Sequence, residues 1–207
     1  MSYATIAAAA ATALALVSTP ALAQSAGDWT LGFGLGVVDP KSNNGKLSGG
    51  TLPVKIDENT QATFTFEYFI ADNLGVEVLA ATPFQHNISI TGLGKVGSTK
   101  HLPPTVSLQY HFNGGGSISP FLGAGVNYTT FFDESTTGAL AGSKLSLRDS
   151  VGLAAHAGVD FRVSDRGAIR ADLRWMDIDS TVKLNGAKIG KTHIDPMVYG
   201  LSYVLRF

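Results

Sequence analysis

The last segment of the chain alternates apolar residues with small or polar ones at a period of two. From Met197 to Phe207 the odd positions are all apolar or aromatic, and the even positions mix glycine, serine, valine and arginine. Side chains of a strand point alternately to opposite sides, so one face of this segment is a continuous apolar surface. The pattern predicts a strand with two unlike faces.

The same period recurs along the chain and predicts eight strands. They are Trp29–Asp39, Gln61–Phe69, Gly75–Thr82, Thr105–Phe112, Pro120–Phe131, Gly152–Val163, Ala168–Met176 and Pro196–Phe207. Long connections (Pro40–Thr60, Pro83–Pro104, Phe132–Val151, Asp177–Asp195) alternate with short turns rich in Asp, Asn, Ser and Gly (Ala71–Leu74, Asn113–Ser119, Ser164–Gly167). An even strand number with this rhythm is typical of a closed membrane barrel.

Alternation alone does not say which face is inside, since a soluble lipocalin-like barrel has its apolar face inward. Aromatic residues gather near strand ends on the apolar face: Trp29, Tyr68, Tyr110, Tyr128, Phe161, Trp175 and Phe207. Such girdles mark the two membrane interfaces, and connections of about 20 residues are long for a small soluble barrel. We therefore expect an all-β fold, an eight-stranded antiparallel transmembrane β-barrel with long extracellular loops and short periplasmic turns.

The first 23 residues resemble a secretory signal peptide. Ile6 to Val17 is apolar, and Ala21 to Ala23 forms a small-residue cleavage site before Gln24. We expect residues 24–207 to form the barrel domain in the bacterial outer membrane. The last apolar side chains, Tyr203, Leu205 and Phe207, look like the carboxyl-terminal signal that barrel-assembly machinery reads.

Composition excludes several function classes. The chain has no cysteine and a net charge of −1, which argues against thiolate chemistry and against a nucleic-acid partner. His86 and His101 flank one long connection, where solvated side chains are expected rather than metal ligands. Ser107 and His111 share a strand face, but about 13 Å separates such positions. We expect no enzyme activity and no cofactor.

Charged side chains occupy the predicted inner face. The acids are Glu67, Glu77, Asp160 and Asp172, and the bases are Arg162, Arg170, Arg174 and Arg206. An eight-stranded barrel is barely wide enough to be filled by its own side chains, so a structural ion-pair network is favoured over an ion pathway. Glycines at 32, 34, 36, 123 and 125 would make room for long side chains from the opposite wall.

Several motifs in order resemble the OmpW family of outer-membrane proteins. They are residues 72–77, 80–84 with His86, 100–105, 120–132, 175–179, 194–196 and the final Arg206-Phe207. The resemblance implies a barrel that extends above the membrane, with a narrow and largely apolar channel for passive uptake of small hydrophobic molecules. It also implies contact with outer-membrane lipids and lipopolysaccharide, and for some members a role as colicin or phage receptor.

Two hypotheses concern the route of a solute. Proline cannot donate to a strand ladder, so Pro83, Pro103 and Pro104 could leave a lateral opening where two strands leave the membrane. The alternative is that these prolines merely end the strands. Inside, Leu79 faces a position that is aromatic in the family and is Arg174 here, which suggests a constriction formed with Glu77 or Asp172. A different function, a surface receptor or stress-response barrel with a plugged lumen, remains open.

Overall fold

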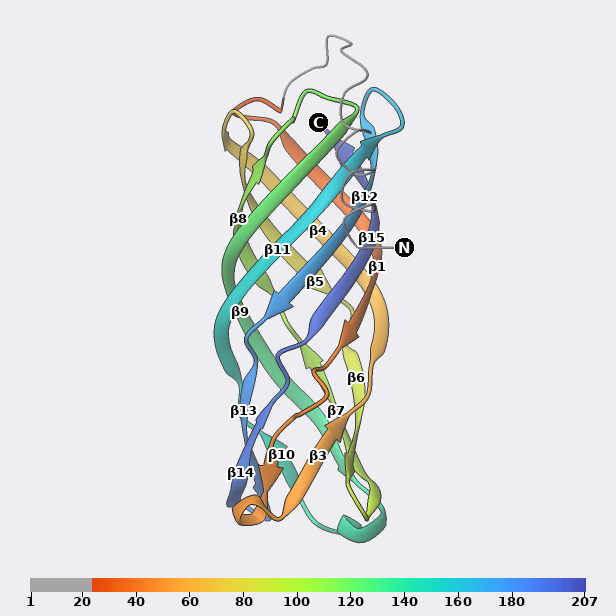
Figure 1. Cartoon of the computed structure of the whole chain (residues 1–207), viewed down its shortest axis with the longest axis vertical. Coiled ribbons are helices and arrows are strands. Elements are labelled where there is room, and N and C mark those ends of the chain that lie inside the picture. The colour runs from red at the N-terminus through yellow and green to blue at the C-terminus, as the bar shows by residue number, and fades with distance from the viewer. Residues whose placement is uncertain (1–23) are drawn as a thin grey trace, which may run out of the picture.

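Eight long strands close into an antiparallel barrel in the computed structural model, which describes residues 24–207 (Figure 1). They are β1 (Trp29–Asp39), β4 (Asn59–Ala71), β5 (Leu74–Ala81), β8 (Thr105–His111), β9 (Ile118–Thr136), β11 (Ser150–Arg162), β12 (Gly167–Met176) and β15 (Met197–Arg206). Each pairs with the next in this order, and β1 pairs with β15 from Thr30 and Arg206 to Asp39 and Met197. The eight-stranded prediction is confirmed.

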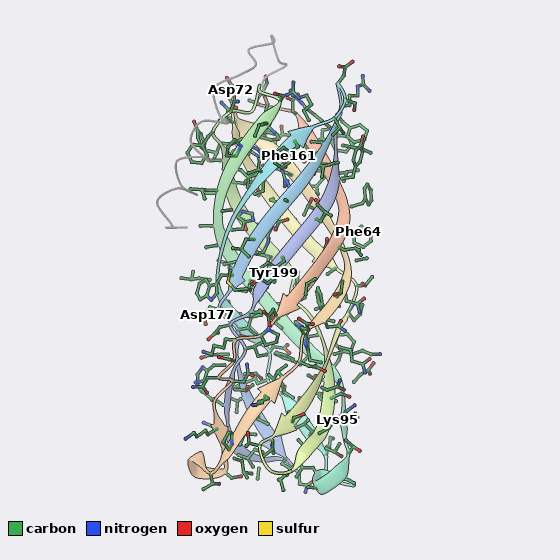
Figure 2. The ribbon with its side chains drawn as sticks, turned by 45° about the vertical axis from the view of Figure 1, so that its right-hand side comes forward. Phe64, Asp72, Lys95, Phe161, Asp177 and Tyr199 are labelled. Carbon is green, nitrogen blue, oxygen red and sulfur yellow. The ribbon has the colours of Figure 1, made fainter. Side chains whose placement is uncertain are left out.

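The outward face of these strands is apolar. Phe64, Phe161 and Tyr199 point away from the barrel in Figure 2, and each keeps more than two fifths of its surface exposed. Leu35 and Leu201, which pair across β1 and β15, are about 60% exposed as well. A soluble barrel would bury these side chains, so the outer face fits a hydrocarbon surrounding.

The long connections are mostly strands, which the sequence analysis wrongly treated as loops. They contain β2 (Lys46–Leu47), β3 (Leu52–Ile56), β6 (Phe84–Ile90), β7 (Gly94–Leu102), β10 (Leu145–Leu147), β13 (Asp179–Leu184), β14 (Ala187–His193) and two 3₁₀ turns, η1 (Ser48–Gly50) and η2 (Gly138–Leu140). They prolong the barrel at one end (Figure 1), which we call the extended end; the other is the short-turn end. Their inward positions mix polar and apolar residues, as His86 and Ile88 do in β6, and this masks the period.

The apolar core lies at the extended end. It includes Phe84, Val96 and Leu145 of β6, β7 and β10, and continues to Val38 and Met176, near the ends of β1 and β12 that adjoin the extended end. Farther toward the short turns, the buried residues are mainly polar or charged. The apolar and polar interiors are therefore stacked along the barrel axis.

The proposed signal peptide, residues 1–23, lies outside the described residues. Within residues 24–207 no helix is long and apolar enough to cross a membrane.

Candidate functional site

Arg170 of β12 is the centre of an ion-pair network that fills the lumen. Its Nε and Nη2 donate to the two carboxylate oxygens of Asp160 at 2.7 and 2.9 Å, and its Nη1 donates to Glu77 at 2.9 Å. The Nη2 atom also lies 3.5 Å from a carboxylate oxygen of Glu67. The guanidinium stacks 4.5 Å from the ring centroid of Phe121. One arginine thus joins carboxylates from β4, β5 and β11.

Arg174 and Leu79 lie closer to the extended end. Nη2 of Arg174 donates to Oε1 of Glu77 at 2.7 Å, whereas its buried Nη1 has no hydrogen-bond partner within residues 24–207. Leu79, Asp172 and Arg174 line one void of about 20 Å³. The structure therefore brings together the four residues of the suspected constriction, with Glu77 as the hydrogen-bonding partner of Arg174.

His111 of β8 forms a second polar cluster. Its Nε2 lies 3.0 Å from Oε1 of Glu67, and Nε2 of Gln109 donates to the same carboxylate. Oγ of Ser119 lies 3.5 Å from Nδ1 of His111. A serine, a histidine and a glutamate do meet here, but all three are buried in the network, where Ser119 is not accessible to a substrate. The cluster is best explained as filling of the lumen.

Arg162 and Arg206 lie at the mouth of the short-turn end rather than at the centre of the network. Nη2 of Arg162 donates to the carbonyl oxygen of Gly114 at 3.4 Å, and Arg206 pairs with Asp28. Both arginines line, with Asp160, a void of about 50 Å³. Their depth along the barrel separates them from Arg170, although all three occupy inward positions.

Glycines in the lumen receive side chains from the neighbouring strand, not from the opposite wall as the sequence analysis expected. A Cβ on Gly123 would lie 1.6 Å from Nε2 of His156, its register partner on β11. A Cβ on Gly75 would lie 2.4 Å from Oε1 of Glu67 on the adjacent β4. In so narrow a barrel a long side chain lies across the inner face of the neighbouring strand, and glycine on that strand leaves the space it occupies.

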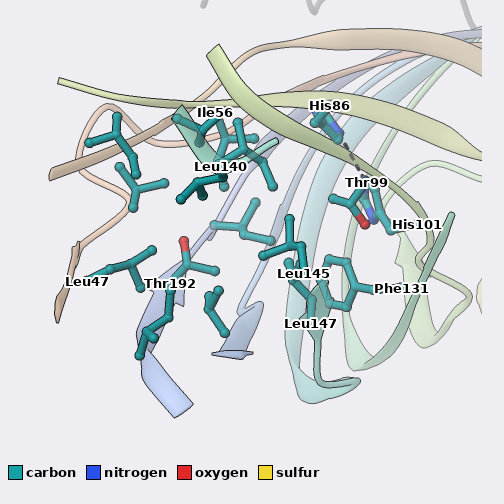
Figure 3. Close-up of a pocket in the computed structure, with 17 residues that line it drawn as sticks. Leu47, Ile56, His86, Thr99, His101, Phe131, Leu140, Leu145, Leu147 and Thr192 are labelled. Carbon is teal, nitrogen blue, oxygen red and sulfur yellow. Dashed lines mark hydrogen bonds between the residues drawn. The ribbon is translucent and has the colours of Figure 1, made fainter. Parts of the chain in front are cut away.

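The extended end encloses a small apolar cavity of about 30 Å³ (Figure 3). Its walls come from the hairpins and from β9, and include Leu47, Ile56, Phe131, Leu140, Leu145 and Leu147. Among the lining residues only His86, Thr99, His101 and Thr192 carry polar side chains. The cavity therefore suits an apolar solute, with few polar groups to orient it.

His86 and His101 meet at this cavity, so the expectation of solvated loop side chains was wrong. They are 2% and 1% exposed, and their Nε2 atoms lie 3.0 Å apart (Figure 3, dashed line). Nδ1 of His86 lies 2.5 Å from the carbonyl oxygen of Asp57. Burial lowers the pKa of His86 and lowers that of His101 to about 3, so both rings are neutral at pH 7.

Strand pairing lapses between the barrel and the β6–β7 hairpin. The ladder between β5 and β8 ends at Leu79 and Thr105, and the ladder between β6 and β7 begins at Phe84 and His101. We call the residues between these pairs, 80–83 and 102–104, the seam. On its other side each chain segment keeps its neighbour, since Thr82 N donates to Ala62 at 2.9 Å and Tyr128 N donates to Pro104 at 3.0 Å. The interruption at the seam therefore lies between these two segments and does not extend to their outer neighbours.

All three prolines of the lateral-opening hypothesis lie in the seam. Pro83 and Pro104 are exposed on the outer surface, whereas Pro103 is buried. Because proline has no amide hydrogen, these positions cannot donate a ladder bond. Asn127 of β9, which the sequence analysis did not single out, anchors the segment: its Nδ2 donates to the carbonyl oxygen of Pro103 at 3.1 Å and to that of Pro104 at 3.3 Å.

The sequence model of the OmpW family matches residues 25–207. The chain belongs to the OmpW family. Outer membrane protein W of Vibrio cholerae is 40% identical over 205 residues, covering 93% of this chain and 94% of the relative. The crystal structure of OprG from Pseudomonas aeruginosa has a TM-score of 0.78 at 36% identity and covers 89% of this chain and 98% of OprG. Outer membrane protein AlkL of Ectopseudomonas oleovorans is 32% identical over 192 residues, which cover 86% of this chain and 82% of AlkL.

This OmpW-family barrel is therefore an outer-membrane protein. In such barrels the short turns face the periplasm and the long connections face outward. The extended end with its apolar cavity is thus extracellular, and the mouth with Arg162 and Arg206 is periplasmic.

One further side-chain group of this OmpW-family chain has metal-ligand types. The ligand atoms of Asp179, His193 and Asp195 lie within 4.8 Å of one another at the base of the extracellular end. Each already has a protein partner: Nδ1 of His193 pairs with Asp179, and Asp195 accepts from Nζ of Lys41 at 2.5 Å. These contacts account for the group as a polar link between β13, β14 and the β1 end.

Proposed function

We propose that this protein conducts small hydrophobic molecules passively across the outer membrane. The solute enters the extracellular apolar cavity and leaves sideways into the bilayer through the seam. The observation that carries this route is the position of His101, which lines the cavity and also forms the first strand pair beyond the seam. Cavity and interruption in the wall are therefore adjacent.

The filled lumen supports a sideways exit. An apolar molecule moving straight on would have to separate the carboxylates of Glu77 and Asp160 from Arg170. Breaking a buried ion pair costs about 3–5 kcal/mol and returns nothing to an apolar solute. Release into lipid instead keeps the solute's apolar surface away from water, which is worth about 25 cal/mol for each Å².

Opening requires movement of the extracellular side chains. A cavity of about 30 Å³ holds roughly one water-sized group, far less than an alkane. The β6–β7 hairpin is paired with β3 on one side and with β9 on the other. No strand pair joins residues 80–83 to residues 102–104, so the wall can separate along the seam without breaking a ladder bond there.

Uptake of n-octane by cells that lack or express the protein tests the function. The seam is tested by a triple variant, Pro83→Ala with Pro103→Ala and Pro104→Ala, which supplies three amide donors and lets the strands pair. We expect faster uptake with the protein and slower uptake with the variant, at equal amounts of folded barrel. Uptake that does not depend on the protein would refute the conduit; unchanged uptake in the variant would refute the sideways exit.

The filled lumen also fits a second candidate, a surface receptor or stress-response barrel that acts through its extracellular end, with colicin or phage among the partners. This candidate predicts that replacing residues 40–60 and 132–151 with other loop sequences abolishes the receptor or stress-response phenotype. Substitutions of Leu79 and Arg174 inside the barrel would then have no effect. The conduit predicts that loss of the uptake phenotype follows changes at the seam.

A further inference from the structure

The outer part of the extracellular end carries positive charge without negative charge. Residues 44–56, 138–148 and 180–192 contain six lysines and one arginine, and no aspartate or glutamate. The neighbouring acids Asp177, Asp179 and Asp195 lie at the membrane ends of β13 and β14 instead. Positive and negative charges of these segments are therefore separated along the barrel axis.

Two of these lysines face each other directly. Lys183 and Lys188 are register partners on β13 and β14, so their side chains leave the sheet on the same face. Both are exposed and neither has an acidic partner, because the lysines that form ion pairs within residues 24–207 are Lys41 and Lys100. Like charges directly opposite each other destabilise a strand pair. The pair of lysines is therefore unfavourable unless an anion lies between the two ammonium groups.

Three further lysines extend this charge to the neighbouring strands. The pair Gly190–Leu47 joins β14 to β2 and places Lys191 beside Lys46. Lys144 lies next to the β13–β14 turn, to which its backbone forms hydrogen bonds. All three lysine side chains are exposed. We call the five residues the lysine patch: Lys46, Lys144, Lys183, Lys188 and Lys191.

The lysine patch belongs to the side wall of the extracellular end (Figure 1, β13 and β14). Exposed side chains of a strand stand roughly perpendicular to its sheet, so the patch faces the surrounding leaflet rather than the space above the barrel. Lys183 lies four residues beyond Asp179, about 13 Å along the strand from the base of this end. In an outer membrane this level is occupied by the sugars of lipopolysaccharide, which carry phosphate and carboxylate groups.

We infer that the lysine patch binds the phosphate groups of the core sugars of lipopolysaccharide, with one phosphate between Lys183 and Lys188. An ammonium group is a compact charge with three donors, and two of them facing each other match the oxygens of one phosphate. The bound phosphate also removes the repulsion within the lysine pair. This binding is independent of the route that a solute takes.

The test is a titration of the barrel in phosphatidylcholine nanodiscs, at low salt, with the phosphorylated core oligosaccharide released from lipopolysaccharide. A second titration uses the same oligosaccharide after removal of its phosphates. Lys183→Gln with Lys188→Gln removes the facing pair. Lys55→Gln with Lys95→Gln is the matched control, since it removes the same charge from two exposed lysines on another part of the wall (Lys95 in Figure 2). These two lie on β3 and β7, about 10 Å apart with β6 between them, and do not face each other.

A lysine near an anionic surface contributes about fivefold in affinity, so the Lys183 and Lys188 variant should bind the phosphorylated oligosaccharide about 25-fold more weakly. The control should lose about threefold or less, because salt screens charges outside the patch. Without oligosaccharide, the β13–β14 hairpin of the Lys183 and Lys188 variant should exchange its amides more slowly than in the wild type, since the repulsion is gone.

Three results would overturn the inference: no binding of the oligosaccharide by the wild type, equal binding after its phosphates are removed, or equal losses in the two double variants. Faster amide exchange in the Lys183 and Lys188 variant would contradict the repulsion on which the phosphate site depends. Folded barrel is confirmed for each variant by its electrophoretic mobility.

Discussion

The strongest test of the lumen network is the replacement of Arg170. Arg170→Met removes the group that holds the carboxylates of Asp160 and Glu77 and faces that of Glu67. Arg170→Lys keeps the charge but not the planar fork of donors. The matched control is Arg206→Met, at the periplasmic mouth.

The expected magnitudes follow from burial. Removing one partner of a buried, hydrogen-bonded ion pair costs about 3–5 kcal/mol, and we expect Arg170→Met to reach this range. A lysine ammonium cannot bond both oxygens of Asp160 and also reach Glu77, so Arg170→Lys should lose about 2–3 kcal/mol. The side chains of Arg206 and Asp28 are 20% and 27% exposed, and water compensates part of their pairing, so Arg206→Met should cost about 1 kcal/mol or less.

The free energy of unfolding is measured by urea titration in lipid vesicles, with the mobility shift of the folded barrel as readout. The three variants should rank Arg170→Met, Arg170→Lys, Arg206→Met in decreasing cost. If Arg170→Met were no more destabilised than Arg206→Met, the lumen would not be held by this network, and the reason for excluding an axial route would be lost.

Three further predictions concern other parts of the barrel. Leu79→Ala with Arg174→Ala should raise single-channel conductance, because both side chains line the void beside Glu77; unchanged conductance would remove them from the constriction. Acidification should loosen the β6–β7 hairpin: burial lowers the pKa of His101 from 6.5 to about 3, so the unfolded segment takes up its proton first, and stability that is full above about pH 6.5 is lost as pH falls toward 3. The loss is about 3 kcal/mol between about pH 7 and about pH 4, seen as lower amide-exchange protection in this hairpin after correction for the intrinsic exchange rate at each pH. It should be smaller in His101→Phe, which keeps only His86, and equal protection at the two pH values would contradict it. Asn127→Ala should speed amide exchange next to the seam and increase solute uptake, because it releases the Pro103 and Pro104 carbonyl groups; no change in either would mean that Asn127 does not anchor the seam.

The sequence predicted the barrel better than its ends. The period of two located the membrane strands, and the first predicted strand, Trp29–Asp39, has the bounds of β1. It also placed charges inward, because alternation fixes the face on which a side chain lies. The period does not give the depth of a side chain along the barrel axis. Arg170 and Arg206 were therefore assigned to one network, although Arg170 lies at its centre and Arg206 at the periplasmic mouth.

Contacts beyond the membrane strands were harder to predict. His86 and His101 lie in hairpins whose inward positions are partly polar, so nothing in the local pattern distinguishes a buried pair from solvated side chains. The role of Asn127 was equally hard to predict. Its position on the inward face of β9 can be read from the sequence, but its hydrogen bonds to the carbonyl oxygens of Pro103 and Pro104 cannot. These partners come from distant segments, and only the closed barrel brings them together.

The most direct measurement compares the seam and the lumen in one uptake assay. Cells expressing the wild type, the triple proline variant or Leu79→Ala with Arg174→Ala take up n-octane, and ion conductance of each purified barrel is recorded beside it. A sideways route predicts reduced uptake only in the proline variant and altered conductance only in the lumen variant. Uptake that rises with the lumen variant and ignores the prolines would show that the solute passes along the barrel axis instead.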